Sequence, residues 1–210
     1  MSFEIIIILL FIIVPSIWWR VTTGGNAWFL PWVGLKRVEK KSVRSFWLSI
    51  GLAALYMLTV ITAHSLIFPM VFLGGFDENL AEFDFGTIIM AIVMGIVPGS
   101  SLLFAMEFFF RGFLGKRLIG KLGFAKGNTI QAIVYGLLLG GIALMMAINA
   151  DLELIIFPAT FFLIFVSFGW VAGYIAEKQA GGSIIPSCAV IITVVLIHIL
   201  PAYFISTIYR

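Results

Sequence analysis

Two ionisable side chains stand inside a strongly apolar stretch of the sequence, at a spacing that lets them interact. Glu107 and Arg111 lie four residues apart in the run 106–114. On a helix this spacing places both side chains on one face, where the guanidinium can pair with the carboxylate and keep it ionised. Charges within a membrane segment are costly, so they mark either a functional site or a self-neutralised structural pair. The spacing alone favours the structural pair.

Other side chains that could act as nucleophiles or metal ligands give weaker signals. Cys188 has no histidine one helical turn away, and a single free cysteine is commonly a small packing residue. His64 is placed near the outer end of an apolar run, and His198 lies close to the C-terminus. Neither belongs to a His-Glu-x-x-His run or to any cluster with ligand spacing. We therefore expect no metal and no cofactor.

The sequence around the pair resembles the first motif of the CAAX prenyl endopeptidase and bacteriocin-processing family of intramembrane proteases, called CPBP or Abi. That motif reads Glu-Glu-x-x-x-Arg, followed by Gly-Phe-Leu. The residues that fit it are Glu107, Phe110, Arg111, Gly112, Phe113, Leu114, Arg117 and Leu118. A second signature, Gly-x-x-x-Gly and Gly-Ser-x-x-Pro, is similar to Gly169, Gly173, Gly182, Ser183 and Pro186. The resemblance covers about residues 87–207, while residues 34–37 match only loosely.

The resemblance implies catalytic positions that this chain fills with apolar residues. Met106 stands where the family has the first Glu, its general base, and the two histidine positions fall on Leu139 and Ile191. Measured from the cytoplasmic ends at about 1.5 Å per residue, the three positions share a depth of roughly 12–16 Å. His198 lies about 10 Å further out on the same face as Ile191, so it does not replace the missing group. Glu107 and Arg111 thus remain as a vestigial, structural part of the motif.

The composition defines the environment in which these residues must be positioned. The 210 residues are 62% hydrophobic and 11% charged, with a mean hydropathy of +1.15. Too few charges exist to solvate a globular surface, so the chain is an integral membrane protein. We expect an all-α, CPBP-like bundle in one domain, residues 1–210, with a core over 87–207 and peripheral helices within 1–73. The six predicted transmembrane helices are Glu4–Val21, Trp47–Leu73, Thr87–Gly112, Thr129–Ile148, Leu154–Ala176 and Ser183–Ile208.

Loop charges predict the orientation of these helices. Basic residues follow the first and third helices and should be cytoplasmic, facing anionic lipid headgroups. They are Arg20, Lys36, Arg37, Lys40, Lys41, Arg44, Lys116, Arg117, Lys121 and Lys126. Acidic residues follow the second and fourth helices and should face outward: Asp77, Glu78, Glu82, Asp84, Asp151 and Glu153. Both termini would then lie outside, in a protein of the plasma membrane, and nothing supports binding to nucleic acid.

Glycines and aromatic residues predict how the helices pack. Glycines four apart allow the close backbone approach typical of membrane bundles. Such pairs occur at Gly95/Gly99, Gly136/Gly140 and Gly169/Gly173, and we expect them to define the inner bundle. The segment Asn26–Lys41 is either an interfacial helix or a plain loop.

Taken together, these residues favour a non-catalytic function. We expect a pseudoprotease that binds or scaffolds a transmembrane or lipidated protein partner in the bilayer, by analogy at the level of the fold alone. The alternative is an intramembrane endopeptidase of the CAAX type that uses Glu107. A transporter is disfavoured, because the predicted midplane lacks the polar residues of a substrate path.

Overall fold

The computed structural model describes residues 3–38, 43–67, 101–149 and 156–191, and every regular element in these ranges is helical. Two of the elements are π-helices, labelled η2 and η3. In chain order the elements are α1 (Phe3–Thr23), α2 (Phe29–Val33), α3 (Val43–Ile67), η2 (Phe108–Gly115), α6 (Lys116–Leu122), α7 (Phe124–Asn149), α8 (Ile156–Tyr174) and η3 (Ile175–Gln179). Residues 101–107 and 185–191 are also helical. The all-α prediction is confirmed for this part of the chain.

Three helical stretches within the described ranges are long and apolar enough to cross a membrane. They are Ile5–Thr23, Phe124–Met145 and Pro158–Gln179. They correspond to three of the predicted spans, and they support an integral membrane protein. Much of the predicted spans Thr87–Gly112 and Ser183–Ile208, and the end of the second span, lie outside the described residues. The number six therefore stays a prediction.

The basic loop predicted after the third span contains a helix instead. α6 covers Lys116–Leu122 and is followed directly by α7, which begins five residues before the predicted start at Thr129. Gly123 joins the two helices with a φ of 77°, a conformation that favours glycine. At Gly127 the backbone of α7 approaches that of α6 so closely that a Cβ would overlap it. α6 is short and carries charges, so it lacks the long apolar run from which the membrane helices were predicted.

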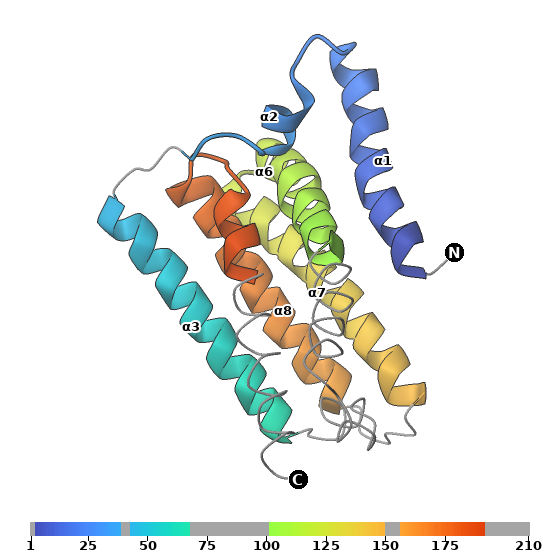
Figure 1. The fold of residues 1–210 in the computed structure, drawn as a ribbon, viewed down its shortest axis with the longest axis vertical. Coiled ribbons are helices and arrows are strands. Elements are labelled where there is room, and N and C mark those ends of the chain that lie inside the picture. Colours follow the sequence, from blue (N-terminus) through green and yellow to red (C-terminus); the bar gives the residue numbers. More distant parts are fainter. Residues whose placement is uncertain (1–2, 39–42, 68–100, 150–155, 192–210) are drawn as a thin grey trace, which may run out of the picture.

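Among the described helices, α7 and α8 make the most extensive contact with each other (Figure 1), and two of the predicted glycine pairs lie at this contact. A Cβ on Gly136 or Gly140 would contact Phe162 of α8 more closely than packing allows. From the α8 side of the same contact, Gly169 lies against Ala132 of α7. Close approach of backbones replaces the hydrophobic driving force that helices lack inside lipid. The pair Gly95/Gly99 lies outside the described residues.

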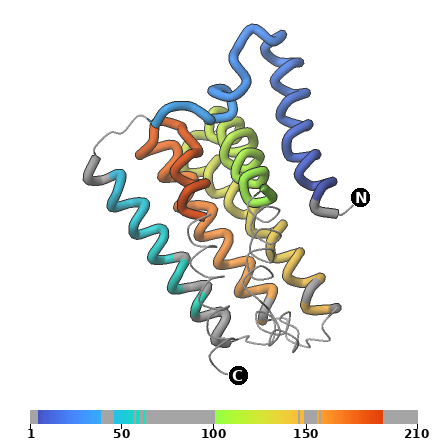
Figure 2. Tube along the Cα trace, viewed as in Figure 1, coloured from blue at the N-terminus to red at the C-terminus, as the bar shows by residue number. Residues whose placement is uncertain are grey.

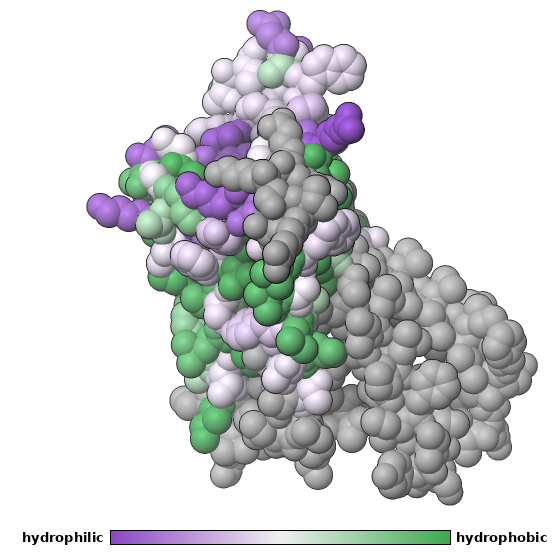
Figure 3. Space-filling model, turned by 90° about the vertical axis from the view of Figure 1, so that its left-hand side faces the viewer, coloured by the Kyte–Doolittle hydropathy of each residue, from purple (hydrophilic) through white to green (hydrophobic). Residues whose placement is uncertain are grey.

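Helices α1 and α3 lie at the periphery of the described bundle. α1 contacts it through aromatic rings, with Phe11 stacked on Phe109 at a centroid distance of 4.7 Å, while most of its apolar side chains are exposed. α3 is joined to α8 by a hydrogen bond between the hydroxyls of Tyr56 and Ser167. The peripheral position of the first two spans in the whole chain stays a prediction. In Figure 3, hydrophilic side chains gather toward one end of the molecule, and apolar side chains are frequent among the coloured atoms farther from that end.

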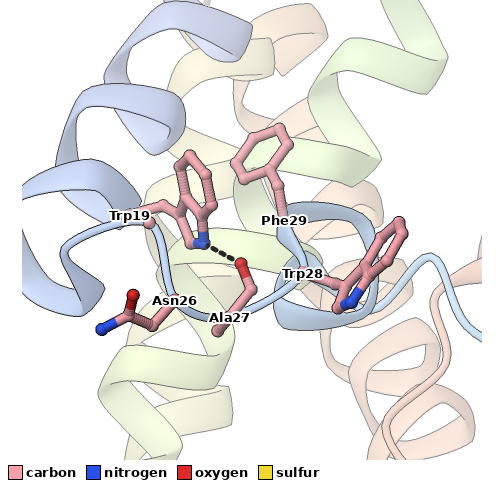
Figure 4. Close-up of a pocket in the computed structure, with 6 residues that line it drawn as sticks. Trp19, Asn26, Ala27, Trp28 and Phe29 are labelled. Carbon is pink, nitrogen blue, oxygen red and sulfur yellow. Dashed lines mark hydrogen bonds between the residues drawn. The ribbon is translucent and has the colours of Figure 1, made fainter.

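A tight connection leads from α1 into α2 (Figure 4). The indole Nε1 of Trp19 donates a hydrogen bond to the carbonyl of Ala27 at 3.0 Å, while Trp28 is 86% exposed. Gly34 caps the end of α2, and its φ of 94° lies in the left-handed region. Val33, the last residue of α2, is fully buried. The described part of the segment Asn26–Lys41 therefore includes one short helix, α2, whose last residue is buried against the bundle.

Candidate functional site

Glu107 and Arg111 form the ion pair that their spacing predicts. Arg111 Nη1 lies 3.0 Å from Glu107 Oε1, and both side chains are almost wholly buried. Glu107 ends the helical residues 101–107, and Arg111 lies within η2. Among the described residues, neither group has a hydrogen bond of good geometry; the nearby Ser187 hydroxyl donates instead to the carbonyl of Ile184 at 2.8 Å. The pair thus neutralises itself largely through its own Coulomb attraction.

Aromatic rings complete the surroundings of the guanidinium. Its central carbon Cζ lies 4.0 Å from the ring centroid of Tyr135 and 5.7 Å from that of Phe168. A cation over an aromatic face is attracted by the ring quadrupole, most strongly where water is excluded. Tyr135 and Phe168 come from α7 and α8, so the two central helices both stabilise the charge of η2.

A buried polar stripe on α7 was missed by the sequence interpretation. Asn128, Gln131 and Tyr135 are all at most 1% exposed. Asn128 Nδ2 donates to the carbonyl of Trp170 at 2.9 Å. Because Gly173 has no side chain, the Asn128 amide fits against the backbone of α8. The signal was present in the sequence, because residues three, four and seven apart share one helical face.

The space between this stripe and Arg111 is small. A cavity of about 10 Å³ is lined by Arg111, Asn128, Gln131 and Glu177, among others. That volume holds about one water molecule. A peptide segment does not fit there without movement of the helices.

The three positions that the resemblance assigns to catalytic groups belong to one hydrophobic cluster. Met106 and Ile191 are each 2% exposed and lie in its buried core, and Leu139 packs against that core as a partly buried side chain. Sequence reasoning placed them at a common depth, and the structure places them in one apolar environment. Neither a thioether nor an aliphatic side chain can take a proton from water at neutral pH, so these residues supply no general base.

The remaining candidate groups are divided between the described and undescribed parts of the chain. Cys188 is 7% exposed and packs with Val33, Phe108 and Ile184, which agrees with a packing role. His198 lies outside the described residues, and the side chain of His64 does too. Among the residues that the structure describes, no three His, Cys, Asp or Glu side chains come together to hold a metal ion.

Segments that carry the family-like motifs meet at one end of the bundle, where residues 34–36 lie beside residues 182–184 (Figure 2). The amide of Ile184 donates to the carbonyl of Gly34 at 3.0 Å. The Ser183 hydroxyl donates to the carbonyl of Lys36 at 2.9 Å. Gly112 lies so close to Val33 that a Cβ would overlap its carbonyl oxygen. We call this arrangement the motif junction, defined by residues 33–36, Gly112, Lys116 and residues 182–184.

Lys116 ties the motif junction together from the start of α6. Its Nζ donates to the carbonyl of Gly182 at 2.7 Å. Burial lowers the pKa of Lys116 below its ordinary value; Glu177 raises it in part, and the cations Lys36 and Arg117 lower it further. Next to it, the guanidinium carbon of Arg117 lies 3.6 Å from the ring centroid of Trp32. Basic side chains here serve as connectors between distant segments.

Comparisons with known proteins yield no relative, since no family model, curated protein or solved structure matches the chain. The class that the described fold and composition define is therefore a helical integral membrane protein.

Proposed function

We propose that the chain is a degenerate, non-catalytic relative of the CPBP intramembrane proteases that binds or scaffolds a transmembrane or lipidated protein partner. The observation that carries the proposal is the shared apolar cluster of Met106, Leu139 and Ile191. Three positions far apart in the sequence come into one environment, as the resemblance requires, yet all three lack a group that could activate water.

The buried ion pair supports the same function. An acid or base must reach its substrate within hydrogen-bond distance, but the Glu107 carboxylate is fully buried and held against Arg111. The neighbouring cavity, about 10 Å³ in volume, is too small for a peptide. A partner would therefore contact the outer faces of the helices, where large apolar side chains are exposed.

Hydrolysis is the competing function, and it can be tested directly. Purified wild-type protein and the Glu107→Gln variant are incubated with farnesylated and transmembrane peptides, and the products are analysed by mass spectrometry. We expect equal, background cleavage from both. Cleavage by the wild type that Glu107→Gln abolishes would replace our proposal with the endopeptidase alternative.

Partner binding calls for capture in native membranes. A photoreactive amino acid is placed at Leu55 or Leu137, which are 60% and 58% exposed, and at buried Phe168 as the matched control. We expect a discrete crosslinked protein from one or both exposed sites and none from the control. Crosslinks to lipid alone at both exposed sites, together with no stoichiometric protein after purification in mild detergent, would contradict a scaffold.

The proposed orientation places both termini outside, in the plasma membrane. Helices α1 and α3 run in opposite directions, and so do α7 and α8 (Figure 1), as this arrangement needs. We predict that a cysteine introduced at Lys40 or Lys121 reacts with an impermeant reagent only after the membrane is opened. A cysteine at Glu82 should react in intact cells. Labelling of all three from the same side would refute the arrangement.

A further inference from the structure

The small cavity beside Arg111 lies where η2, α6, α7 and η3 come together. Arg111 lines it from η2, Ile119 from α6, Asn128 and Gln131 from α7, and Glu177 from η3. Ile119 and Glu177 are half-buried, whereas the other three are at most 3% exposed. The cavity therefore reaches from a half-buried rim to the buried guanidinium of the ion pair.

The buried side chains that line this cavity carry polar atoms without protein partners. Within the described ranges, this holds for Oδ1 of Asn128, for both polar atoms of the Gln131 amide, and for Nε and Nη2 of Arg111. The Nδ2 atom of Asn128 is already used in the hydrogen bond to Trp170. Buried polar groups in native proteins are almost all hydrogen-bonded, to protein or to ordered water. These atoms therefore point to a polar ligand in the cavity.

The mixture of donors and acceptors identifies the kind of ligand. Arg111 offers N–H donors, Asn128 offers an acceptor oxygen, and Gln131 offers one group of each kind. An anion would meet the acceptor oxygens, and a cation would meet the guanidinium. Either ion would also add a net charge beside a pair that is already neutral, in an interior where an uncompensated charge is very costly. Water both donates and accepts, so it can satisfy this set of groups.

The size of the cavity leads to the same choice. Its volume is about 10 Å³, and a buried water needs roughly 10–15 Å³ and two to four polar partners. The side chains of Arg111, Asn128 and Gln131 supply that number of partners. A second water or a larger polar molecule does not fit beside the first.

We propose that this cavity is a binding site for a single ordered water molecule, which accepts a hydrogen bond from Arg111 and donates to the side-chain oxygens of Asn128 and Gln131. The water links η2 to α7, and it lets a polar stripe persist inside an apolar bundle. The three positions that the resemblance assigns to catalytic groups do not line the cavity. The site therefore does not depend on the proposed function, and its water is not the nucleophile of a protease.

Nuclear magnetic resonance of the full chain tests the proposal, because the sequence has only two glutamines, Gln131 and Gln179. The protein is labelled with ¹⁵N in its glutamine side-chain amides and studied in detergent micelles, and Gln131→Met assigns the two signals. We expect a cross-peak between water and the Gln131 amide protons, with the sign of a long-lived bound molecule. The cross-peak should remain in a Tyr135→Phe background, which excludes transfer through that buried hydroxyl.

Displacing the water tests the cavity itself. Ala176 lines the cavity, and Ala176→Val adds two methyl groups that should abolish the cross-peak of Gln131 with water. Ala159→Val, at an exposed alanine of α8 outside the cavity, is the matched control and should retain it. Ile119→Phe fills the cavity from the rim and substitutes if Ala176→Val fails to fold, as judged by size-exclusion chromatography.

Three results would each overturn the proposal. One is the absence of the long-lived cross-peak at Gln131 in the wild type. Another is a cross-peak that survives both cavity variants. The third is a shift of the Gln131 signals that saturates as sodium or chloride is added, because this would show that the cavity binds an ion in place of water.

Discussion

Arg111 and Lys116 are five residues apart, and the molecule satisfies their charges in opposite ways. Arg111 is 3% exposed and pairs with Glu107, one turn earlier in the same helical stretch, at 3.0 Å. Lys116 lies at the end of the bundle and reaches across 66 positions of sequence to the carbonyl of Gly182, at 2.7 Å. In the interior the partner is local, whereas at the end of the bundle the partner is a distant segment.

This difference follows from the environment of each charge. Deep in an apolar bundle, an ion without a partner is very costly, and a partner on the same helix is present as soon as that helix forms. Near the headgroup region, water and lipid can solvate a lysine, so its contacts are free to hold the motif junction together. The interior pair should therefore control stability, and the junction should control how the α1–α2 segment is held.

The largest effect is expected from separating the interior pair. Glu107→Leu or Arg111→Leu alone strands a buried charge and should cost about 3–5 kcal/mol, whereas replacing both should be near neutral. Thermal unfolding in detergent of the two single variants and the double variant measures this coupling. If the single losses simply add, the side chains do not stabilise each other and the proposed contrast with Lys116 fails.

A smaller loss is expected where backbones meet at the motif junction. Gly112→Ala places a Cβ against the carbonyl oxygen of Val33, and such overpacking costs about 1–3 kcal/mol. Gly120→Ala is the matched control, because nothing lies within 4 Å of its Cβ and alanine favours a helix by about 0.5–1 kcal/mol. The two variants should shift the unfolding temperature in opposite directions, and shifts of the same sign would contradict the close approach.

Removing the connector at the junction should have a local effect. Lys116→Met deletes the hydrogen bond to Gly182, which is worth about 1–2 kcal/mol for a charged donor in a partly exposed site. Proteolysis of residues 24–42 should be faster in the Lys116→Met variant than in the wild type. Lys121→Met, at an exposed lysine, is the control and should leave the rate of proteolysis unchanged. Unaltered protection in Lys116→Met would show that the contacts of Gly34 and Ser183 suffice to hold the segment.

The weakest effect is expected between α3 and α8. Tyr56→Phe removes the hydrogen bond to Ser167, and bonds of this kind between membrane helices average about 0.6 kcal/mol. Ser167→Ala should cause a similar loss, and the double variant no more than either one. Thr59→Val serves as the control, since Thr59 donates only to Leu55 of its own helix. Additive losses in the double variant would exclude the contact.

Local features of the fold were predictable, and contacts between segments were less so. Apolar runs located α1, α7 and α8, and the start of α3, to within five residues. The spacing of Glu107 and Arg111 predicted their pairing. The short polar helix α6 was missed, since its stability comes from packing on α7 rather than from an apolar run. The burial of Asn128, Gln131 and Tyr135 was also missed, although their periodicity could have indicated it.

The sequence by itself determined that the chain is a helical membrane protein, that Glu107 and Arg111 share a helical face, and that Met106, Leu139 and Ile191 carry no catalytic group. These properties depend on composition and on spacing within one helix. Only the tertiary structure decided that these three apolar residues share one cluster, that residues 33–36 dock onto residues 182–184, and that Arg111 lines one cavity with Asn128 and Gln131. Such contacts join segments separated by many residues, and they arise from shape and close packing, which no local pattern encodes.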